Sequence, residues 1–193
     1  MFVVIPEATS LNIYRYGLYE EDLTKTLLYS LKHGMVFFDI GAHYGYYTLL
    51  ASFLVGEEGQ VHSFEPTPYS FDVLKLNAKN KINIILNNCA VYSTKKNLII
   101  NDYGIQYSAF NSIYNARLPK IVLQNLKSKK LLVESISIDE YVERTCIVPD
   151  FIKIDAESSE YEILIGMEKT IKKFYPKISF EVGDMDVHGV PKS

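Results

Sequence analysis

The sequence predicts an α/β fold, with a doubly wound, mostly parallel sheet and helices on both of its faces. Residues 35–40 form a continuous apolar run, as in a strand buried on both faces of a parallel sheet. A turn with two glycines follows this run and leads into a second apolar stretch over residues 46–55. Short apolar runs then alternate with helical patterns, which is typical of strands joined by right-handed helical crossovers.

The first half of the chain gives the following elements in order. Residues 18–32 carry leucines at helical spacing, and Gly34 provides the stop before the strand at 35–40. The glycine turn leads into a helix that reaches about residue 53, and residues 60–64 form the second strand. Thr67 before Pro68 is typical of an N-cap and a first helical position, so residues 68–80 are predicted to be helical. Residues 82–86 form the third strand.

The second half begins with a polar excursion. Residues 97–100 and 131–138 are predicted strands, and they flank an insertion over residues 101–128 that is rich in Tyr, Ser and Asn. Loops of this length are usually functional or mobile. Residues 151–154 form a short buried strand, and Ser159 with Glu162 predicts a capped helix that continues to about residue 174. A last strand follows over residues 177–182. We expect one domain over residues 1–193, with residues 1–34 as a helical lead-in.

Composition and charge exclude several classes of protein. The 193 residues are 48% hydrophobic, enough for a substantial core. A net charge of −3 and a pI near 5.8 give no overall field that would attract nucleic acid or an anionic membrane. The longest apolar stretch, residues 44–55, is too short for a membrane span, and no signal sequence opens the chain, so we expect a cytoplasmic protein. Cys89 and Cys146 are expected to be buried, free thiols.

Three carboxylates stand at the ends of predicted buried strands. Asp39 ends the first strand, Glu65 follows Gly41 by 24 positions at the end of the second, and Asp155 ends the strand at 151–154. In an open parallel sheet, ligands bind outside the carboxyl ends of the strands, where the strand order reverses. We therefore expect Asp39, the glycine turn, Asp155 and the nearby Glu157 to converge on one crevice.

The acidic character of these strand ends limits the choice of cofactor. The chain lacks both the Gly-x-Gly-x-x-Gly and the Gly-Lys-Ser/Thr patterns that cradle phosphates. A cofactor with a cationic head, a neutral ribose and no phosphate suits carboxylates better. S-adenosylmethionine has this chemistry, since its ammonium and sulfonium groups are positive and its ribose offers hydroxyl donors.

Several motifs resemble one known family. They are Gly17-Leu-Tyr-Glu20, Phe38-Asp-Ile-Gly-Ala-His-Tyr-Gly-Tyr-Tyr47, Val61-His-Ser-Phe-Glu-Pro66, Ser137-Ile-Asp139 and Phe151-Ile-Lys-Ile-Asp-Ala-Glu157. In this order they resemble the FkbM family of class I S-adenosylmethionine-dependent methyltransferases, from about residue 14 to residue 182. The resemblance implies a Rossmann-like methyltransferase fold and transfer of a methyl group to a small-molecule or glycan hydroxyl.

The resemblance also implies roles for individual residues. It places the turn of Gly41, Ala42, His43, Tyr44 and Gly45 at the methionine part of the cofactor, and we expect Asp39 to contact polar groups of the cofactor. It places Glu65 and Pro66 at the ribose, and Asn88, Cys89 and Ala90 beside the adenine. Two departures stand out: serine replaces the family's glycine at position 158, and the last two strands of the fold are apparently absent from this chain.

The chemistry leaves alternatives open. Asp155 or Glu157 is our candidate for the general base that takes the acceptor proton, with His43 next. Asp155, Glu157 and Glu181 could instead form an oxygen-ligand Mg²⁺ site, although no metal is our main expectation. Other readings of the same sheet are a nicotinamide-dependent oxidoreductase and a non-catalytic, nucleoside-binding or scaffold module.

Overall fold

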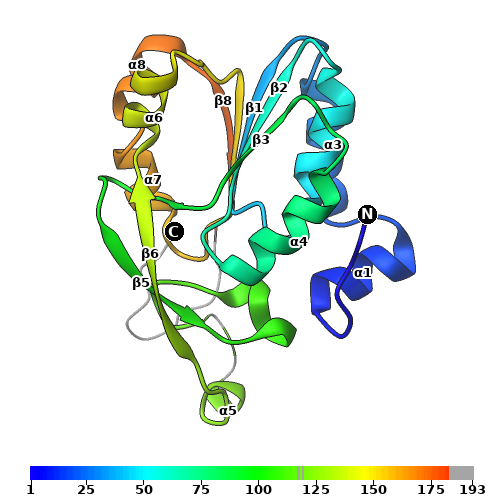
Figure 1. Ribbon diagram of the computed structural model, residues 1–193, viewed down its shortest axis with the longest axis vertical. Helices are drawn as coiled ribbons and strands as arrows, with labels where there is room; N and C mark the ends of the chain where they lie inside the picture. The colour runs from blue at the N-terminus through cyan, green and yellow to red at the C-terminus, as the bar shows by residue number, and fades with distance from the viewer. Residues whose placement is uncertain (117, 119, 183–193) are drawn as a thin grey trace.

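The computed structural model describes residues 1–116, 118 and 120–182. Its centre is a five-stranded, all-parallel sheet with the order β3-β2-β1-β7-β8 (Figure 1). The strands are β1 (Val36–Ile40), β2 (Gln60–Phe64), β3 (Ile84–Asn87), β7 (Phe151–Ile154) and β8 (Lys177–Phe180). Because β1 lies between β2 and β7, the strand order reverses at β1, as the sequence predicted, and the carboxyl ends of all five strands meet at one edge.

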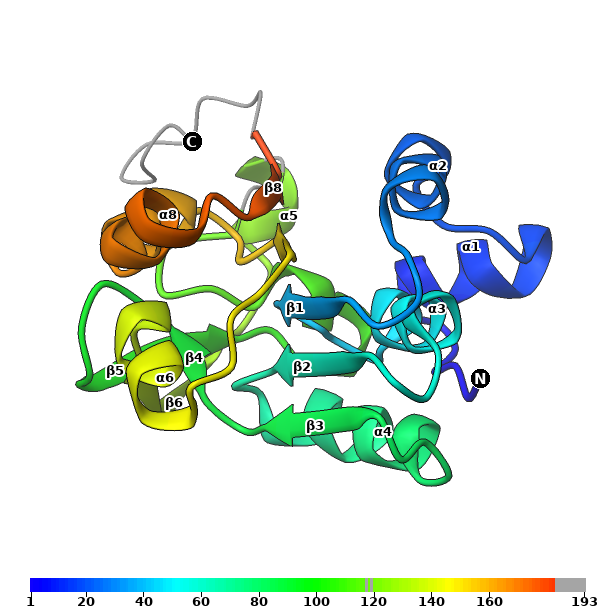
Figure 2. The ribbon, with the colours of Figure 1, turned by 90° about the horizontal axis from the view of Figure 1, so that it is seen from above.

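Helices cover both faces of this sheet (Figures 1 and 2). One face carries α3 (Tyr46–Val55) and α4 (Pro68–Ala78), and the other carries α6 (Ile138–Thr145), α7 (Glu160–Ile165) and α8 (Glu168–Phe174). Neighbouring β1 residues point to opposite faces, so Phe37 belongs to the core under α3 while Phe38 belongs to the core under α6 and α7. The helical lead-in consists of α1 (Ala8–Tyr16) and α2 (Glu21–Ser30), and Leu27 of α2 packs into the α3 core.

A second, smaller sheet has the order β4-β6-β5. Its strands are β4 (Ala90–Val91), β5 (Asn97–Asp102) and β6 (Lys129–Ile136), and β5 runs antiparallel to β6. Figure 1 shows β5 and the start of β6 extending from the central sheet. The insertion between them includes η1, a 3-10 helix over Ile105–Phe110, and the short α5 (Lys120–Leu123).

The predicted elements differ from the structure where tertiary contacts intervene. The single helix predicted over residues 159–174 is two helices, separated at Gly166 and Met167. Gly166 packs against the carbonyl of Tyr92, where a Cβ would lie only 2.3 Å from the oxygen. Ser159 makes no capping hydrogen bond with its side chain, so the predicted capping box is wrong. The strand predicted to reach residue 138 ends at Ile136, because Ser137 caps α6 by accepting a hydrogen bond from the Glu140 N–H.

Two further expectations can be compared with the structure. Both cysteines are free as expected, but neither is fully buried: Cys89 is partly buried, and Cys146 is exposed because it ends α6 at the surface. No helix within residues 1–116 and 120–182 is long and apolar enough to cross a membrane.

Candidate cofactor and acceptor site

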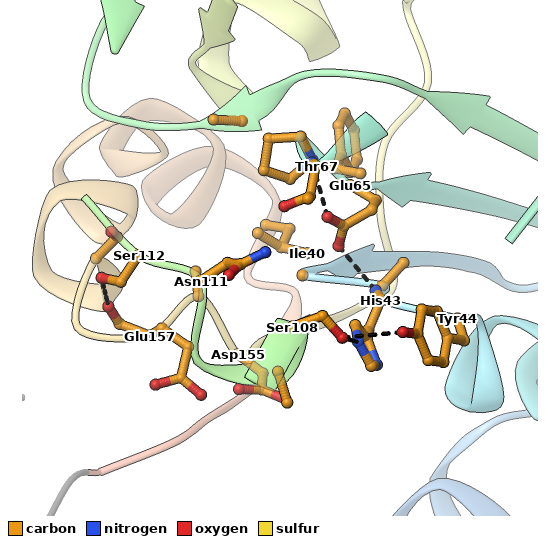
Figure 3. Close-up of a pocket in the computed structure, with 18 of the residues that line it drawn as sticks. Ile40, His43, Tyr44, Glu65, Thr67, Ser108, Asn111, Ser112, Asp155 and Glu157 are labelled. Carbon is orange, nitrogen blue, oxygen red and sulfur yellow. Dashed lines mark hydrogen bonds between the residues drawn. The ribbon is translucent and has the colours of Figure 1, made fainter. Parts of the chain in front are cut away.

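A cavity of about 1180 Å³, part of it open to solvent, lies at the carboxyl ends of β1, β2, β7 and β8. The loops after β1 and β7 form one side, which we call the floor: residues 41–45, residues 155–159 and Lys153. Residues 101–116 of the insertion form the opposite side, which we call the cover. Figure 3 shows residues of both sides facing the cavity.

Most residues that the sequence predicted for the site line this cavity. They are Gly41, Ala42, His43, Tyr44, Glu65, Pro66, Ala90, Asp155 and Glu157. Asp39, Gly45, Asn88 and Cys89 lie behind the cavity wall. The Asn88 amide donates to the Glu65 carbonyl at 2.8 Å, so this side chain holds the loop after β2 instead. Cys89 packs against the core near α6, where burial raises the pKa of its thiol to about 11.

The side chain of Asp39 is fully buried and pairs with Lys153. The Lys153 Nζ lies 3.3 Å from the Asp39 carboxylate and 3.3 Å from that of Asp155, and it donates to the Gly41 carbonyl at 3.1 Å. Burial alone would lower the pKa of Lys153, but the two carboxylates raise it above its ordinary value. Asp39 also accepts a hydrogen bond from the Thr48 hydroxyl at 2.6 Å. Lys153 therefore ties together Asp39 at the end of β1, the loop at Gly41 and the loop at Asp155.

Sequence reasoning missed Lys153. A charged residue inside the apolar run Phe151-Ile-Lys-Ile154 was the available signal, because a buried lysine needs a carboxylate partner. Its ammonium also lies over an aromatic ring, with the Nζ 5.2 Å from the centre of the Tyr47 ring. The Tyr47 hydroxyl donates to the Glu20 carboxylate at 2.7 Å, which links the lead-in to the same side of the cavity.

The glycine loop is held by its own backbone. The N–H groups of Gly41 and Ala42 both donate to the Phe64 carbonyl at 3.0 Å. These two N–H groups are therefore not offered to a ligand. A Cβ at Gly41 would lie 1.7 Å from the Asp155 carbonyl oxygen, and one at Gly45 would lie 2.5 Å from the Leu74 side chain. The glycines allow the two floor loops and α4 to pack, so a substitution there disturbs the fold as well as any ligand.

Glu65 is buried at the end of β2 and faces the cavity (Figure 3). One carboxylate oxygen accepts from the His43 N–H at 2.9 Å, and the other accepts from the Thr67 N–H at 2.8 Å. Burial raises the pKa of Glu65 to about 7, against these two hydrogen bonds, which lower it. A carboxylate offers about four lone-pair sites, so two remain for the hydroxyl groups of a bound ribose.

Two serines attach the cover to the floor. The Ser108 hydroxyl of η1 lies 2.9 Å from His43 Nε2 and 2.9 Å from the Tyr44 hydroxyl. The rings of His43 and Tyr44 stack with their centres 3.8 Å apart. Burial lowers the pKa of His43 to about 4, so the imidazole is neutral at pH 7. The Ser112 hydroxyl donates to the Glu157 carbonyl at 2.5 Å (Figure 3).

Three carboxylates, those of Asp155, Glu157 and Glu181, lie together at one part of the cavity wall, which we call the acidic mouth. One carboxylate oxygen of each lies within 4.8 Å of the others. Partial burial and the neighbouring Asp155 charge together raise the pKa of Glu181 to about 7. The group has the donor set for a hard divalent cation, so the magnesium alternative stays a prediction.

The loop after β7 has an unusual backbone. Glu157 and Ser158 have φ angles of 47° and 76°, in the left-handed region where non-glycine residues are strained. Position 158 is where the resemblance implied glycine, and the chain keeps the left-handed conformation with serine. The Glu160 carboxylate accepts from the Ala156 N–H at 3.0 Å and so steadies this turn.

Comparison with known proteins identifies the family and agrees with the fold. The family model described as the methyltransferase FkbM domain matches residues 39–190. Among solved structures, the methyltransferase FkbM from Methylobacillus flagellatus KT superposes with a TM-score of 0.53 at 17% identity, over 88% of this chain. A precorrin-6y C5,15-methyltransferase from Geobacter metallireducens GS-15 gives a TM-score of 0.51 at 15% identity, covering 88% of this chain and 67% of its own. No match was found among curated proteins.

The two structures support the fold alone, because identity is low. The chain spans 36% of the length of the Methylobacillus flagellatus protein. Its sheet order and its helices on both faces agree with the Rossmann-like arrangement that the sequence predicted.

Proposed function

The chain belongs to the FkbM methyltransferase family, and on that basis we propose that it transfers a methyl group from S-adenosylmethionine to a hydroxyl group of a small-molecule or glycan acceptor. The observation that carries the proposal is an acidic cavity at the point where the strand order reverses, in a chain that lacks the glycine motifs that bind phosphates. S-adenosylmethionine is the cofactor of such a methyltransferase, and it supplies an activated methyl group on a positively charged sulfur.

The cavity residues fit this cofactor by their chemistry. Glu65 keeps two acceptor sites for ribose hydroxyls, and the N–H groups of Gly41 and Ala42 are bonded to the Phe64 carbonyl, so these two do not cradle a phosphate. An apolar wall of Ala90, Leu98 and Ile100 suits the flat face of an adenine. The acidic mouth favours the cationic amino-acid end.

The acceptor would enter between the acidic mouth and the cover. Ser108, Asn111 and Ser112 line that side and offer hydroxyl and amide groups, which suit a polyol. Holding the nucleophile in line with the methyl group can contribute roughly 7–11 kcal/mol. The floor residues favour such positioning, because the Lys153 contacts fix the Gly41 loop relative to Asp155.

A nearby carboxylate would accept the hydroxyl proton as the new bond forms, typically for a 10²–10⁴-fold gain in rate. Asp155 and Glu157 are the candidates, as both line the cavity at the mouth. Asp155→Asn or Glu157→Gln should then lower turnover at saturating cofactor by roughly 10²-fold. Dependence of turnover on Mg²⁺, lost with a chelator, would favour the metal alternative instead.

Calorimetric titration with S-adenosylhomocysteine tests the proposal without knowledge of the acceptor. We expect binding to the wild type, a loss of about 1.5–3 kcal/mol in Glu65→Gln, and no change in Glu58→Gln, an exposed turn residue. NADH serves as the competing ligand. No binding of S-adenosylhomocysteine, or preferential binding of NADH, would overturn the proposal.

A further inference from the structure

The β5–β6 ribbon has one face in the core and one in solvent. Its inner face contributes Ile100 and Val133 to a buried cluster next to the cavity. On the outer face, Ile99 and Leu132 stand directly opposite each other, with 56% and 71% of their surface exposed. Aliphatic side chains paired in this way form an apolar spot that no residue within 1–116 and 120–182 covers.

Lysines lie at both ends of this spot. Lys95 and Lys96 precede β5, while Lys129 and Lys130 begin β6, and all four are exposed. Since the strands are antiparallel, the two pairs lie at opposite ends of the ribbon, roughly 20 Å apart for six residues. The Lys96 ammonium lies over the Tyr92 ring, and the Lys130 ammonium donates to the Asn101 side chain. Both lysines are exposed in spite of these contacts.

The net charge of the chain conceals this distribution. Residues 93–134 hold seven of the 20 Lys and Arg residues and two of the 23 Asp and Glu residues, so this segment is basic in an acidic protein. Of those two acidic residues, Asp102 accepts hydrogen bonds from the Gly104 N–H and the Asn111 amide. Glu134 stands on the outer face, opposite Asn97.

We propose that the outer face of the β5–β6 ribbon docks on the surface of a bilayer that contains anionic lipids. By the alternation of β6, Lys130 shares the outer face with Leu132, whereas Lys129 is on the side of Val133. The long lysine side chains at both ends of the ribbon can extend toward headgroup phosphates while the aliphatic pair between them enters the interfacial region. Each lysine near an anionic surface adds attraction within a Debye length. Single-stranded nucleic acid fits less well, because binding it uses aromatic side chains for stacking and the outer face of β5 and β6 offers none.

The proposal goes beyond methyl transfer and does not depend on it. Docking by this face would place the cavity on the other side of the same ribbon, since Leu98 and Ile100 of its inner face line that cavity. A bound bilayer would therefore lie beside the cover without filling the site.

Cosedimentation with vesicles tests the proposal. The full chain should bind vesicles of phosphatidylcholine with about 30% phosphatidylserine and leave pure phosphatidylcholine vesicles unbound, with binding that weakens as salt is raised. Lys129→Glu/Lys130→Glu should lower binding by at least about tenfold. Ile99→Asn/Leu132→Asn should lower it by about fivefold or more, with the melting curve retained because both residues are exposed.

Lys79→Glu/Lys81→Glu is the matched control, since it makes the same charge change at exposed positions by α4 and β3. Retained binding in this control supports the ribbon. An equal loss in both charge variants, no binding to anionic vesicles, equal binding to neutral ones, or tighter binding to a single-stranded oligonucleotide would each overturn the proposal.

Discussion

The floor and the cover of the cavity are held by different kinds of interaction. The floor contains the buried Lys153, which contacts two carboxylates and a carbonyl, and a backbone contact between Gly41 and Asp155 that leaves no room for a Cβ. The cover is attached through two serine hydroxyls, at Ser108 and Ser112. Breaking a buried ion pair costs 3–5 kcal/mol, whereas one hydrogen bond contributes about 0.5–1.5 kcal/mol. We therefore expect ligands to enter by displacement of the cover.

The largest effect is expected when Lys153 is changed. Lys153→Met leaves the fully buried Asp39 carboxylate without its cation, so we expect a loss of about 3–5 kcal/mol in the free energy of unfolding, measured with urea. Lys25→Met is the control, because its ion pair with Glu21 is exposed and should change stability by less than about 0.5 kcal/mol.

A double variant separates charge balance from positioning at the floor. Lys153→Met/Asp39→Asn removes both buried charges, so it should regain much of the stability. The Gly41 carbonyl and Asp155 still lack the Lys153 ammonium, so the affinity for S-adenosylhomocysteine should stay at least about tenfold below that of the wild type. Recovery of affinity together with stability would mean that Lys153 only neutralises Asp39.

The next effect concerns pH and Glu65, which joins the floor to β2. With a folded pKa of about 7 against an ordinary value of 4.5, this carboxyl keeps its proton in the folded state while the unfolded state loses it. The shifted pKa of Glu65 therefore lowers the free energy of unfolding by about 3 kcal/mol as pH rises from 4.5 to 7. Ribose binding favours the ionised form, so affinity for S-adenosylhomocysteine should rise over that same range and level off above pH 7.

The opposite trends in stability and affinity should both flatten in Glu65→Gln. Urea unfolding and calorimetry at several pH values measure them on one preparation. Affinity that is independent of pH in the wild type would contradict the ribose role of Glu65.

Much of the floor could be predicted from the sequence, because its signals are local. The apolar run before Asp39 and the spacing to Glu65 predict adjacent strands, and the structure pairs β1 with β2 and β7. The partners of Asp39 were not predictable from spacing. Lys153 is 114 positions away, and only the sheet register places it opposite Asp39.

The cover was harder to predict, because its structure depends on contacts with the floor. Residues 101–128 have no apolar period, and η1 is held by Ser108 against the stacked rings of His43 and Tyr44. The missed helix α6 did have a local signal, since Ser137 and Glu140 have the spacing of a capping box. The break between α7 and α8 also had a local signal, since a glycine can end a helix and α7 ends at Gly166.

A smaller effect is expected at the cover. Ser108→Ala removes the hydroxyl that joins His43 and Tyr44, so stability should fall by about 1–2 kcal/mol. Hydrogen exchange should accelerate over residues 101–116 and stay unchanged over residues 41–45. Ser128→Ala, an exposed site of the same insertion, is the control. Equal acceleration in floor and cover would show that the two sides open as one unit.

The smallest effect is expected at Ser158. It lies on the floor loop next to Glu157, whose carbonyl accepts a hydrogen bond from the Ser112 hydroxyl. Its φ of 76° costs a serine about 1 kcal/mol or more and costs glycine almost nothing. Ser158→Gly should therefore raise the free energy of unfolding by about 1 kcal/mol, even though the unfolded chain gains some freedom. Ser159→Gly is the matched control, because its φ is −100° and glycine there should lower stability by about 0.5–1 kcal/mol. If both variants lower stability equally, the loop is not strained at position 158, and the serine is as well suited to the floor as a glycine.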